Sequence, residues 1–247
     1  EKMGMGLWNR AVEQRTNQNT IARLSDGLHV GLAGTGAPIP DTKRVGVSTF
    51  VIAGSSLFVV DTGPGSTRKL ELMQVPLGRI DAVLLTHFHS DHIGDLGELM
   101  LKAWTTGART KPLHVIGPVG VDRVVYGFNQ AYALDSDYRT LHHGPTVADS
   151  RGAGGVSQSI DLKDKASTAI VFQNADLKVS AFLVDHRPVS SAFGYRFDYK
   201  GRSVVISGDT LPDEALRREA QNVDLLLHEV LNPEMLLTMN RAAARSG

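Results

Sequence analysis

The sequence is organised around residues 84–92, which read Leu84-Leu85-Thr86-His87-Phe88-His89-Ser90-Asp91-His92. Three histidines and one aspartate lie within the last six of these positions. The apolar run 82–85 has the character of a buried strand, and apolar residues recur afterwards at helical spacing: Ile93, Leu96, Met100 and Trp104. The polar side chains therefore fall on a turn between a strand and a helix, where several can point at one position. Imidazole nitrogen and carboxylate oxygen are ligands that suit zinc.

The composition is that of a globular domain. Of the 247 residues, 42% are hydrophobic and 21% are charged. The formal net charge is zero, so no overall charge attracts the chain to nucleic acid or to anionic lipid, and a nucleic-acid partner is not favoured. The chain has no cysteine, which excludes disulfides and thiolate zinc ligands. No apolar run reaches the roughly 18 residues expected of a transmembrane span.

Apolar periodicity predicts two groups of strands, each followed by helices. The expected strands cover 28–36, 45–60 (two strands about the turn 54–56), 113–118, 168–173, 177–184, 191–199, 202–207 and 223–227. Two expected helices cover residues 66–74 and 213–221. Another follows residue 92, one begins at Val121, and the last begins near Pro233. We expect residues 1–27 to be an N-terminal lead-in and residues 28–247 to form one domain. Two sheets would pack face to face, with the helices outside.

Residues 143–166 are rich in glycine and polar side chains, and they predict a loop insertion. A long loop in a compact domain often serves as a substrate lid or arm. His142 and His143 stand at its start and are candidates for binding substrate.

Further candidate ligands lie where other predicted strands end. His186 follows the strand 177–184, Asp209 follows 202–207, and His228 follows 223–227. The histidines of residues 87–92 also follow a strand, so this regularity predicts that all these side chains meet at one edge. Asp61 ends a strand as well, but we favour a role in holding a loop by hydrogen bonds over a role as a metal ligand.

The motif His-x-His-x-Asp-His at 87–92 resembles that of the metallo-β-lactamase superfamily, and the resemblance covers nearly the whole chain. Residues 34–44, 58–65, 185–195, 207–210 and 227–229 resemble motifs of its tRNase Z, arylsulfatase and cyclic-nucleotide phosphodiesterase branch. The resemblance implies an α/β fold, an αββα sandwich of two mixed β-sheets with helices on both outer faces.

The resemblance also implies two zinc ions per chain, although manganese or iron suits similar ligands. It divides the ligands between the ions, with the first held by His87, His89 and His186, the second by Asp91 and His92, and both by Asp209. The family has a further histidine ligand on a strand after its last helix. The printed sequence stops before such a strand, so we expect its C-terminal end to be incomplete.

These features predict a zinc-dependent hydrolase in which a metal-bound hydroxide attacks a phosphodiester or related ester, including an aryl sulfate, on a small molecule. Asp91 would also orient the nucleophile. His228, steered by Glu229, would protonate the leaving oxygen.

Two alternatives stay open. One is a tRNA 3′-processing endonuclease, which the sequence disfavours because Val-Leu, and not the Ala-Thr of tRNase Z, follows His228-Glu229. The other is a superfamily member that binds metal without catalysis. A homodimer is also left open. The chain begins with Glu1, so both a cytoplasmic protein and one exported after loss of a signal are compatible with the sequence.

Overall fold

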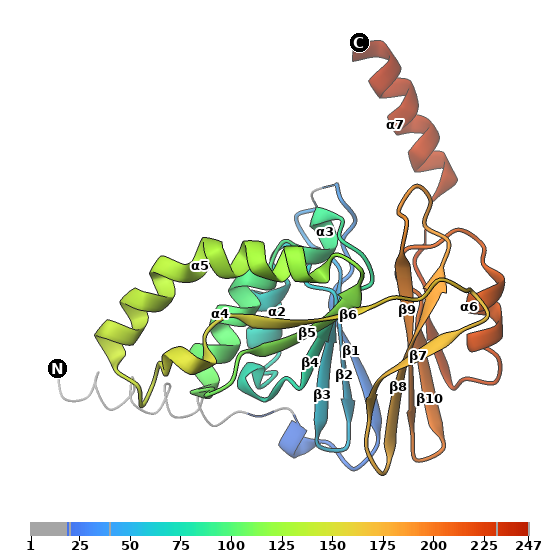
Figure 1. The fold of residues 1–247 in the computed structure, drawn as a ribbon. Helices are drawn as coiled ribbons and strands as arrows, with labels where there is room; N and C mark the ends of the chain where they lie inside the picture. Colours follow the sequence, from blue (N-terminus) through green and yellow to red (C-terminus); the bar gives the residue numbers. More distant parts are fainter. Residues whose placement is uncertain (1–18, 20, 40, 231, 247) are drawn as a thin grey trace, which may run out of the picture.

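Two β-sheets lie face to face, and helices cover their outer faces (Figure 1). The computed structural model describes residues 19, 21–39, 41–230 and 232–246. The first sheet has six strands in the order β1-β2-β3-β4-β5-β6, and the second has five in the order β11-β10-β9-β8-β7. The strands are β1 (Leu28–Gly34), β2 (Ser48–Ala53), β3 (Ser56–Val60), β4 (Ala82–Leu84), β5 (Leu113–Pro118), β6 (Gly155–Ile160), β7 (Thr168–Gln173), β8 (Leu177–Val184), β9 (Ala192–Tyr199), β10 (Arg202–Ile206) and β11 (Leu225–Leu227).

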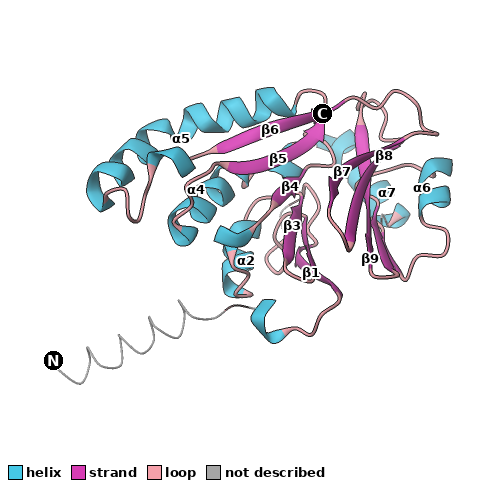
Figure 2. Cartoon of the chain, turned by 60° about the horizontal axis from the view of Figure 1, so that its bottom comes forward, coloured by secondary structure: helices cyan, strands magenta, loops and turns pink. Residues whose placement is uncertain are grey.

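Both sheets are mixed. In the first, β1, β2 and β3 run antiparallel, and β3 to β6 run parallel. In the second, β7 to β10 run antiparallel, and β11 lies parallel to β10. Figure 2 shows the two sheets from another side, with helices outside them. The predicted αββα sandwich of two mixed sheets is confirmed.

The described part of the chain has helices on both outer faces and one helix that points away from the sheets (Figure 1). They are α2 (Ser66–Leu72), α3 (Ser90–Ile93), α4 (Leu96–Gly107), α5 (Val121–His143), α6 (Glu214–Glu219) and α7 (Pro233–Ser246), with short 3-10 helices at Ile21–Arg23, Leu77–Arg79 and Ser150–Gly152. Buried side chains of α2, α4 and α5 pack on the first sheet, and those of α6 pack on the second. α7 extends away from both sheets (Figure 1).

Alternation along β3 supplies two different cores. Leu57 and Val59 face the helices that cover the first sheet, whereas Phe58 and Val60 face the second sheet. Successive side chains of a strand point to opposite faces, so a strand buried on both sides has an unbroken apolar sequence. Between the sheets, the ring of Phe58 contacts that of Phe197 edge to face, with centroids 5.7 Å apart.

The predicted loop 143–166 is wrong in part. Residues Gly155–Ile160 form β6, which pairs with β5 along its whole length and is an edge strand of the first sheet. This strand contains glycine, serine and glutamine and lacks a clear apolar pattern. Backbone hydrogen bonds to β5 can hold such a strand without strong burial of its side chains. The predicted strands and the helix beginning at Val121 are confirmed.

Most of the predicted lead-in, residues 1–27, lies outside the described residues, which begin with residue 19. Within the described part, Ile21–Arg23 form a 3-10 helix. Among the described helices, none has the length and apolar character needed to cross a lipid bilayer.

Candidate metal centre

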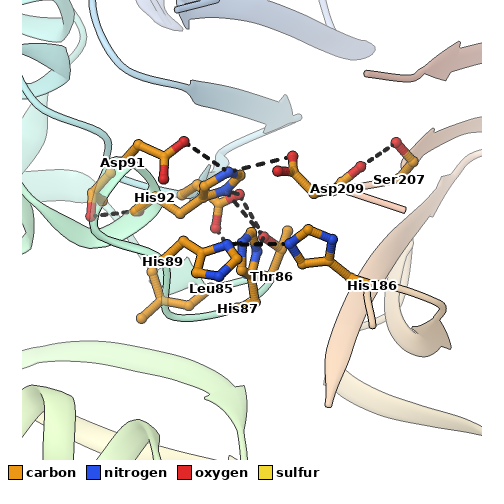
Figure 3. A network of polar contacts seen from close by, with 12 residues as sticks. Leu85, Thr86, His87, His89, Asp91, His92, His186, Ser207 and Asp209 are labelled. Carbon is orange, nitrogen blue, oxygen red and sulfur yellow. Dashed lines mark hydrogen bonds and ion pairs between the residues drawn. The ribbon is translucent and has the colours of Figure 1, made fainter. Parts of the chain in front are cut away.

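Three strand ends bring the predicted ligands together at one edge of the sandwich (Figure 3). β4 leads into residues 85–92, here called the metal loop, which carries His87, His89 and His92. β8 leads into His186, and β10 leads into Asp209. The metal loop belongs to the first sheet and the other two segments belong to the second, so the cluster lies where the two sheets meet.

His87, His89 and His186 form a first group, whose ligand atoms lie within 4.8 Å of one another. The Nδ1 atom of His89 lies 2.9 Å from His87 Nε2 and 3.2 Å from His186 Nε2. A single proton on His89 Nδ1 can form a hydrogen bond to only one of these two nitrogens. A cation would serve all three nitrogens, because two atoms bound to one zinc ion at ~2.1 Å lie about 3.0 to 3.4 Å apart. The spacing and the chemistry of this donor set therefore fit a zinc ion.

His87, His92 and Asp209 form a second group. Asp209 Oδ1 lies 3.4 Å from His92 Nε2, and Asp91 Oδ2 lies 3.7 Å from the same nitrogen. This grouping differs from the implied division of ligands, because His87 joins both groups and Asp91 falls in neither of them. The rings of His87 and His92 have centroids only 4.1 Å apart, which makes the two groups neighbours that share a histidine. Asp91 lies beside His92 at the edge of the second group (Figure 3).

Burial and neighbouring charge shift the pKa values of His87 and His92 in opposite directions. Burial, together with the positive charge of His92, lowers the pKa of His87 to about 3, so the His87 ring is neutral at neutral pH. Burial also lowers the pKa of His92, but the carboxylates of Asp61 and Asp209 outweigh it and raise that pKa to about 10. For Asp209, burial raises the pKa, and the hydrogen bond and charge of His92 outweigh it, so the pKa lies below its ordinary value. A metal ion that takes His92 Nε2 displaces a proton.

Asp61 is hydrogen-bonded to two residues of the metal loop, Thr86 and His92. Its Oδ2 atom lies 2.9 Å from His92 Nδ1 and accepts a hydrogen bond of 2.8 Å from the Thr86 hydroxyl. Its Oδ1 atom accepts from the Thr86 backbone N–H at 2.8 Å. Asp61 belongs to neither ligand group of the described residues. The geometry agrees with the expected role of Asp61 in holding a loop by hydrogen bonds, and it directs His92 Nε2 toward Asp209.

The loop that carries Asp209 presses against the metal loop. Gly208 has a φ of +62°, and a Cβ there would lie 2.9 Å from both Thr86 Cβ and Phe193 O. Only glycine suits this backbone conformation and this close approach. The Leu211 N–H donates to the Asp185 carbonyl at 2.7 Å, which joins the segment of Asp209 to that of His186.

His228 and Glu229 follow β11, the strand beside β10. The carboxylate of Glu229 accepts a hydrogen bond from the backbone N–H of Thr210, the residue after Asp209. His228 Nδ1 lies 2.8 Å from the backbone carbonyl oxygen of Glu229 and not from its carboxylate. The contact between His228 and Glu229 is therefore made by the backbone of Glu229, and the role of this pair in proton transfer stays a prediction. Because β10 and β11 pair as parallel neighbours, Glu229 lies alongside the Asp209 loop and its carboxylate holds that loop.

His142 and His143 lie away from the cluster. α5 begins next to the metal loop, since a Cβ on Gly120 would lie 3.3 Å from Phe88 Cε2. The two histidines end this helix, ~33 Å further on at ~1.5 Å per residue. The helix runs on to His143 and carries both histidines away from the metal cluster, so they do not reach it as expected, and substrate binding by them stays a prediction.

Sequence patterns missed two buried residues that position the cluster. Thr86 contacts Asp61 and His87, and Tyr195 donates a hydrogen bond to the Leu85 carbonyl from the opposite sheet. A signal for Thr86 was present, because it is a polar residue between a buried strand and a ligand. Tyr195 gave none, because an aromatic residue in an apolar strand predicts only core packing.

The sequence model described as the Metallo-beta-lactamase superfamily matches residues 41–238. Ribonuclease Z of Mycobacterium bovis (strain BCG / Pasteur 1173P2) is 36% identical over 212 residues, which cover 85% of this chain and 72% of that protein. Ribonuclease Z of Mycolicibacterium gilvum (strain PYR-GCK) is 34% identical over 211 residues, covering 85% and 71%. The crystal structure of the short form of human tRNase Z has a TM-score of 0.64 at 23% identity, covering 86% of this chain and 82% of that chain. This structural likeness is one of fold.

Proposed function

This chain belongs to the metallo-beta-lactamase superfamily, and from that premise we propose that it is a metal-dependent ribonuclease that processes the 3′ end of tRNA. The observation that carries a hydrolytic function is the convergence of His87, His89, His92, His186 and Asp209 from both sheets. The RNA substrate is supported by relatives that carry the name ribonuclease Z at 34% and 36% identity. We therefore propose RNA as the substrate in place of the small-molecule ester that the sequence pattern favoured.

Zinc is the proposed ion, with two per chain. In such a site zinc supplies Lewis acidity, stabilises negative charge on a phosphoryl oxygen and lowers the pKa of a bound water to about 7. The side chains of the two ligand groups would set the positions of the ions. The two ligand groups share His87, and Asp209 faces His92 across 3.4 Å. Asp91 Oδ2 lies 3.7 Å from His92 Nε2, at the edge of the group, where it can accept a proton from the attacking water.

His228 is the proposed general acid. Its Nδ1 lies 2.8 Å from the carbonyl oxygen of Glu229, and a carbonyl oxygen can only accept, so Nδ1 carries a proton. When the ring is in its imidazolium form, Nε2 carries the second proton and can donate it to the leaving oxygen, which leaves the neutral ring with its proton on Nδ1. The side chain of His228 is exposed, at the same sheet edge as Asp209, where a large substrate can reach it.

A small phosphodiester or sulfate ester is the second candidate substrate. The observation that favours it is the formal net charge of zero, since a chain that binds RNA gains affinity from excess positive charge near the phosphates.

The deciding experiment incubates the zinc-loaded protein with a precursor tRNA that carries a 3′ trailer, and in parallel with an aryl phosphodiester, a cyclic nucleotide and an aryl sulfate. We expect cleavage at one position near the 3′ end of the tRNA, and RNA binding that weakens steeply as salt rises. The Asp209→Ala variant is the control for cleavage by a contaminating nuclease. Turnover of a small ester without RNA cleavage would favour the second candidate. Two bound zinc ions without turnover of any substrate would indicate a non-catalytic metal-binding protein.

A further inference from the structure

Thr86 lies directly before the first histidine of the metal loop, and it is fully buried. Its Oγ1 atom lies 2.8 Å from Asp61 Oδ2 and 3.0 Å from His87 Nδ1. We propose that this hydroxyl is a positioning group that fixes the His87 ring with its proton on Nδ1, so that Nε2 is free to bind metal. The inference rests on the proposed metal site and adds a residue that controls it.

The two partners of the Thr86 hydroxyl, Asp61 and His87, determine which group donates in each hydrogen bond. A carboxylate can only accept, so at 2.8 Å from Asp61 the Thr86 hydroxyl must donate its single proton to that carboxylate. The lone pairs of the hydroxyl then face His87 Nδ1, which must be the donor. The opposite nitrogen, Nε2, carries no proton. It is this nitrogen that lies 2.9 Å from His89 Nδ1, inside the first ligand group.

The same carboxylate also orients His92. Asp61 Oδ2 lies 2.9 Å from His92 Nδ1, so the second nitrogen of this ring, Nε2, is turned to Asp209. His92 thus contacts the carboxylate directly, whereas His87 contacts it through the hydroxyl of Thr86. Since His87 belongs to both ligand groups, loss of this hydroxyl weakens both. Groups that orient metal-ligating histidines in this way typically contribute 10- to 100-fold to metal affinity.

Three variants test the role of the hydroxyl. Thr86→Val keeps the shape but leaves the His87 Nδ1–H without an acceptor, and we expect zinc affinity to fall about 10- to 100-fold. Thr86→Ser retains the hydroxyl and should keep most of the affinity. Thr67→Val is the matched control, because Thr67 is equally buried but its hydroxyl contacts only the Asp95 carbonyl, at 3.5 Å. Zinc affinity is measured by competition with a chromophoric chelator, without any RNA substrate. Equal affinities for Thr86→Val and the wild type would overturn the proposal.

A direct reading of the tautomer covers the case in which Thr86→Val does not fold. Long-range proton–nitrogen NMR spectra of the 15N-labelled wild type show which nitrogen of His87 carries the proton, both before and after zinc is added. We expect Nδ1–H in both states, and a proton on Nε2 in the zinc-free protein would overturn the proposal. This reading needs neither activity nor bound metal. A wild type that binds no zinc but has the expected tautomer would contradict the proposed function while supporting the role of Thr86.

Discussion

The phenol of Tyr195, on β9 of the second sheet, donates a hydrogen bond of 2.7 Å to the carbonyl oxygen of Leu85, which lies two residues before His87. A second bond next to it, from Phe193 N–H to the Thr86 carbonyl at 2.9 Å, joins the same two segments. Burial raises the pKa of Tyr195, so its hydroxyl stays a donor throughout the ordinary pH range. These two bonds set the distance between the metal loop and the sheet that supplies His186 and Asp209.

Tyr195→Phe should therefore lower both the stability of the fold and the affinity for zinc. The variant keeps the ring in the core but leaves the buried Leu85 carbonyl without its donor, at a cost of about 1 to 3 kcal/mol in the free energy of unfolding. Urea denaturation measures this loss. Tyr138→Phe is the control, because Tyr138 is 56% exposed on α5, and its effect should stay within about 0.5 kcal/mol. Equal stability of the two variants would contradict the role given to Tyr195.

Asp209→Asn should remove the metal ion of the second group while the fold remains. The amide keeps the size of the side chain but loses the negative charge that faces His92. We expect the zinc content per chain to fall by about one ion and hydrolysis to fall at least about 100-fold, since a neutral amide oxygen is a far weaker zinc ligand than a carboxylate. Elemental analysis and circular dichroism check the two statements. Full zinc content in the variant would show that Asp209 is not a ligand.

Glu229→Ala should loosen the Asp209 loop without touching a ligand. The change leaves the Thr210 N–H without its carboxylate partner. We expect about 10-fold weaker zinc binding, and Glu229→Gln should lie between this variant and the wild type. The matched control is Glu214→Ala, because that side chain is 85% exposed on α6. If Glu229→Ala binds zinc as tightly as this control does, Glu229 has no part in holding the loop.

His228→Ala should leave the zinc content nearly unchanged and slow turnover. Loss of a general acid typically costs about 100- to 10,000-fold in rate. The effect should be largest for substrates with poor leaving groups, because an activated leaving group departs without a proton. Rates for a nitrophenyl ester and for the unactivated RNA linkage make the comparison. Equal slowing of both would count against the role of an acid.

Removal of metal by a chelator should abolish hydrolysis and lower the melting temperature while leaving the secondary structure in place. The two hydrophobic cores on the faces of the first sheet consist of buried side chains that need no ion. A ligand present at 100 times its Kd stabilises the folded state by about 2.7 kcal/mol, so the shift on removal should be readily measured. Zinc should restore both properties. Magnesium should not, because it prefers oxygen ligands to imidazole; rescue by magnesium would argue against a histidine-bound metal.

The sequence alone determined the local elements and the chemistry of the ligands. Unbroken apolar runs at 57–60, 82–84 and 204–206 predict β3, β4 and β10, because a strand segment buried on both faces needs apolar residues at successive positions. The position of a histidine or an aspartate just past such a strand predicted the edge at which His186 and Asp209 meet the metal loop. These inferences succeed because strand periodicity and strand ends are properties of neighbouring residues.

Only the tertiary structure decided which groups face one another. The edge strand β6 has only a weak apolar pattern, and its pairing with β5 is visible only in the fold. The carboxylate of Glu229 binds the Asp209 loop and not the His228 ring, because β11 lies parallel to β10. The contacts of Thr86 with Asp61 and of Tyr195 with Leu85 join residues 25 and 110 positions apart. Such contacts depend on strand order and sheet packing, which no local pattern of residues encodes.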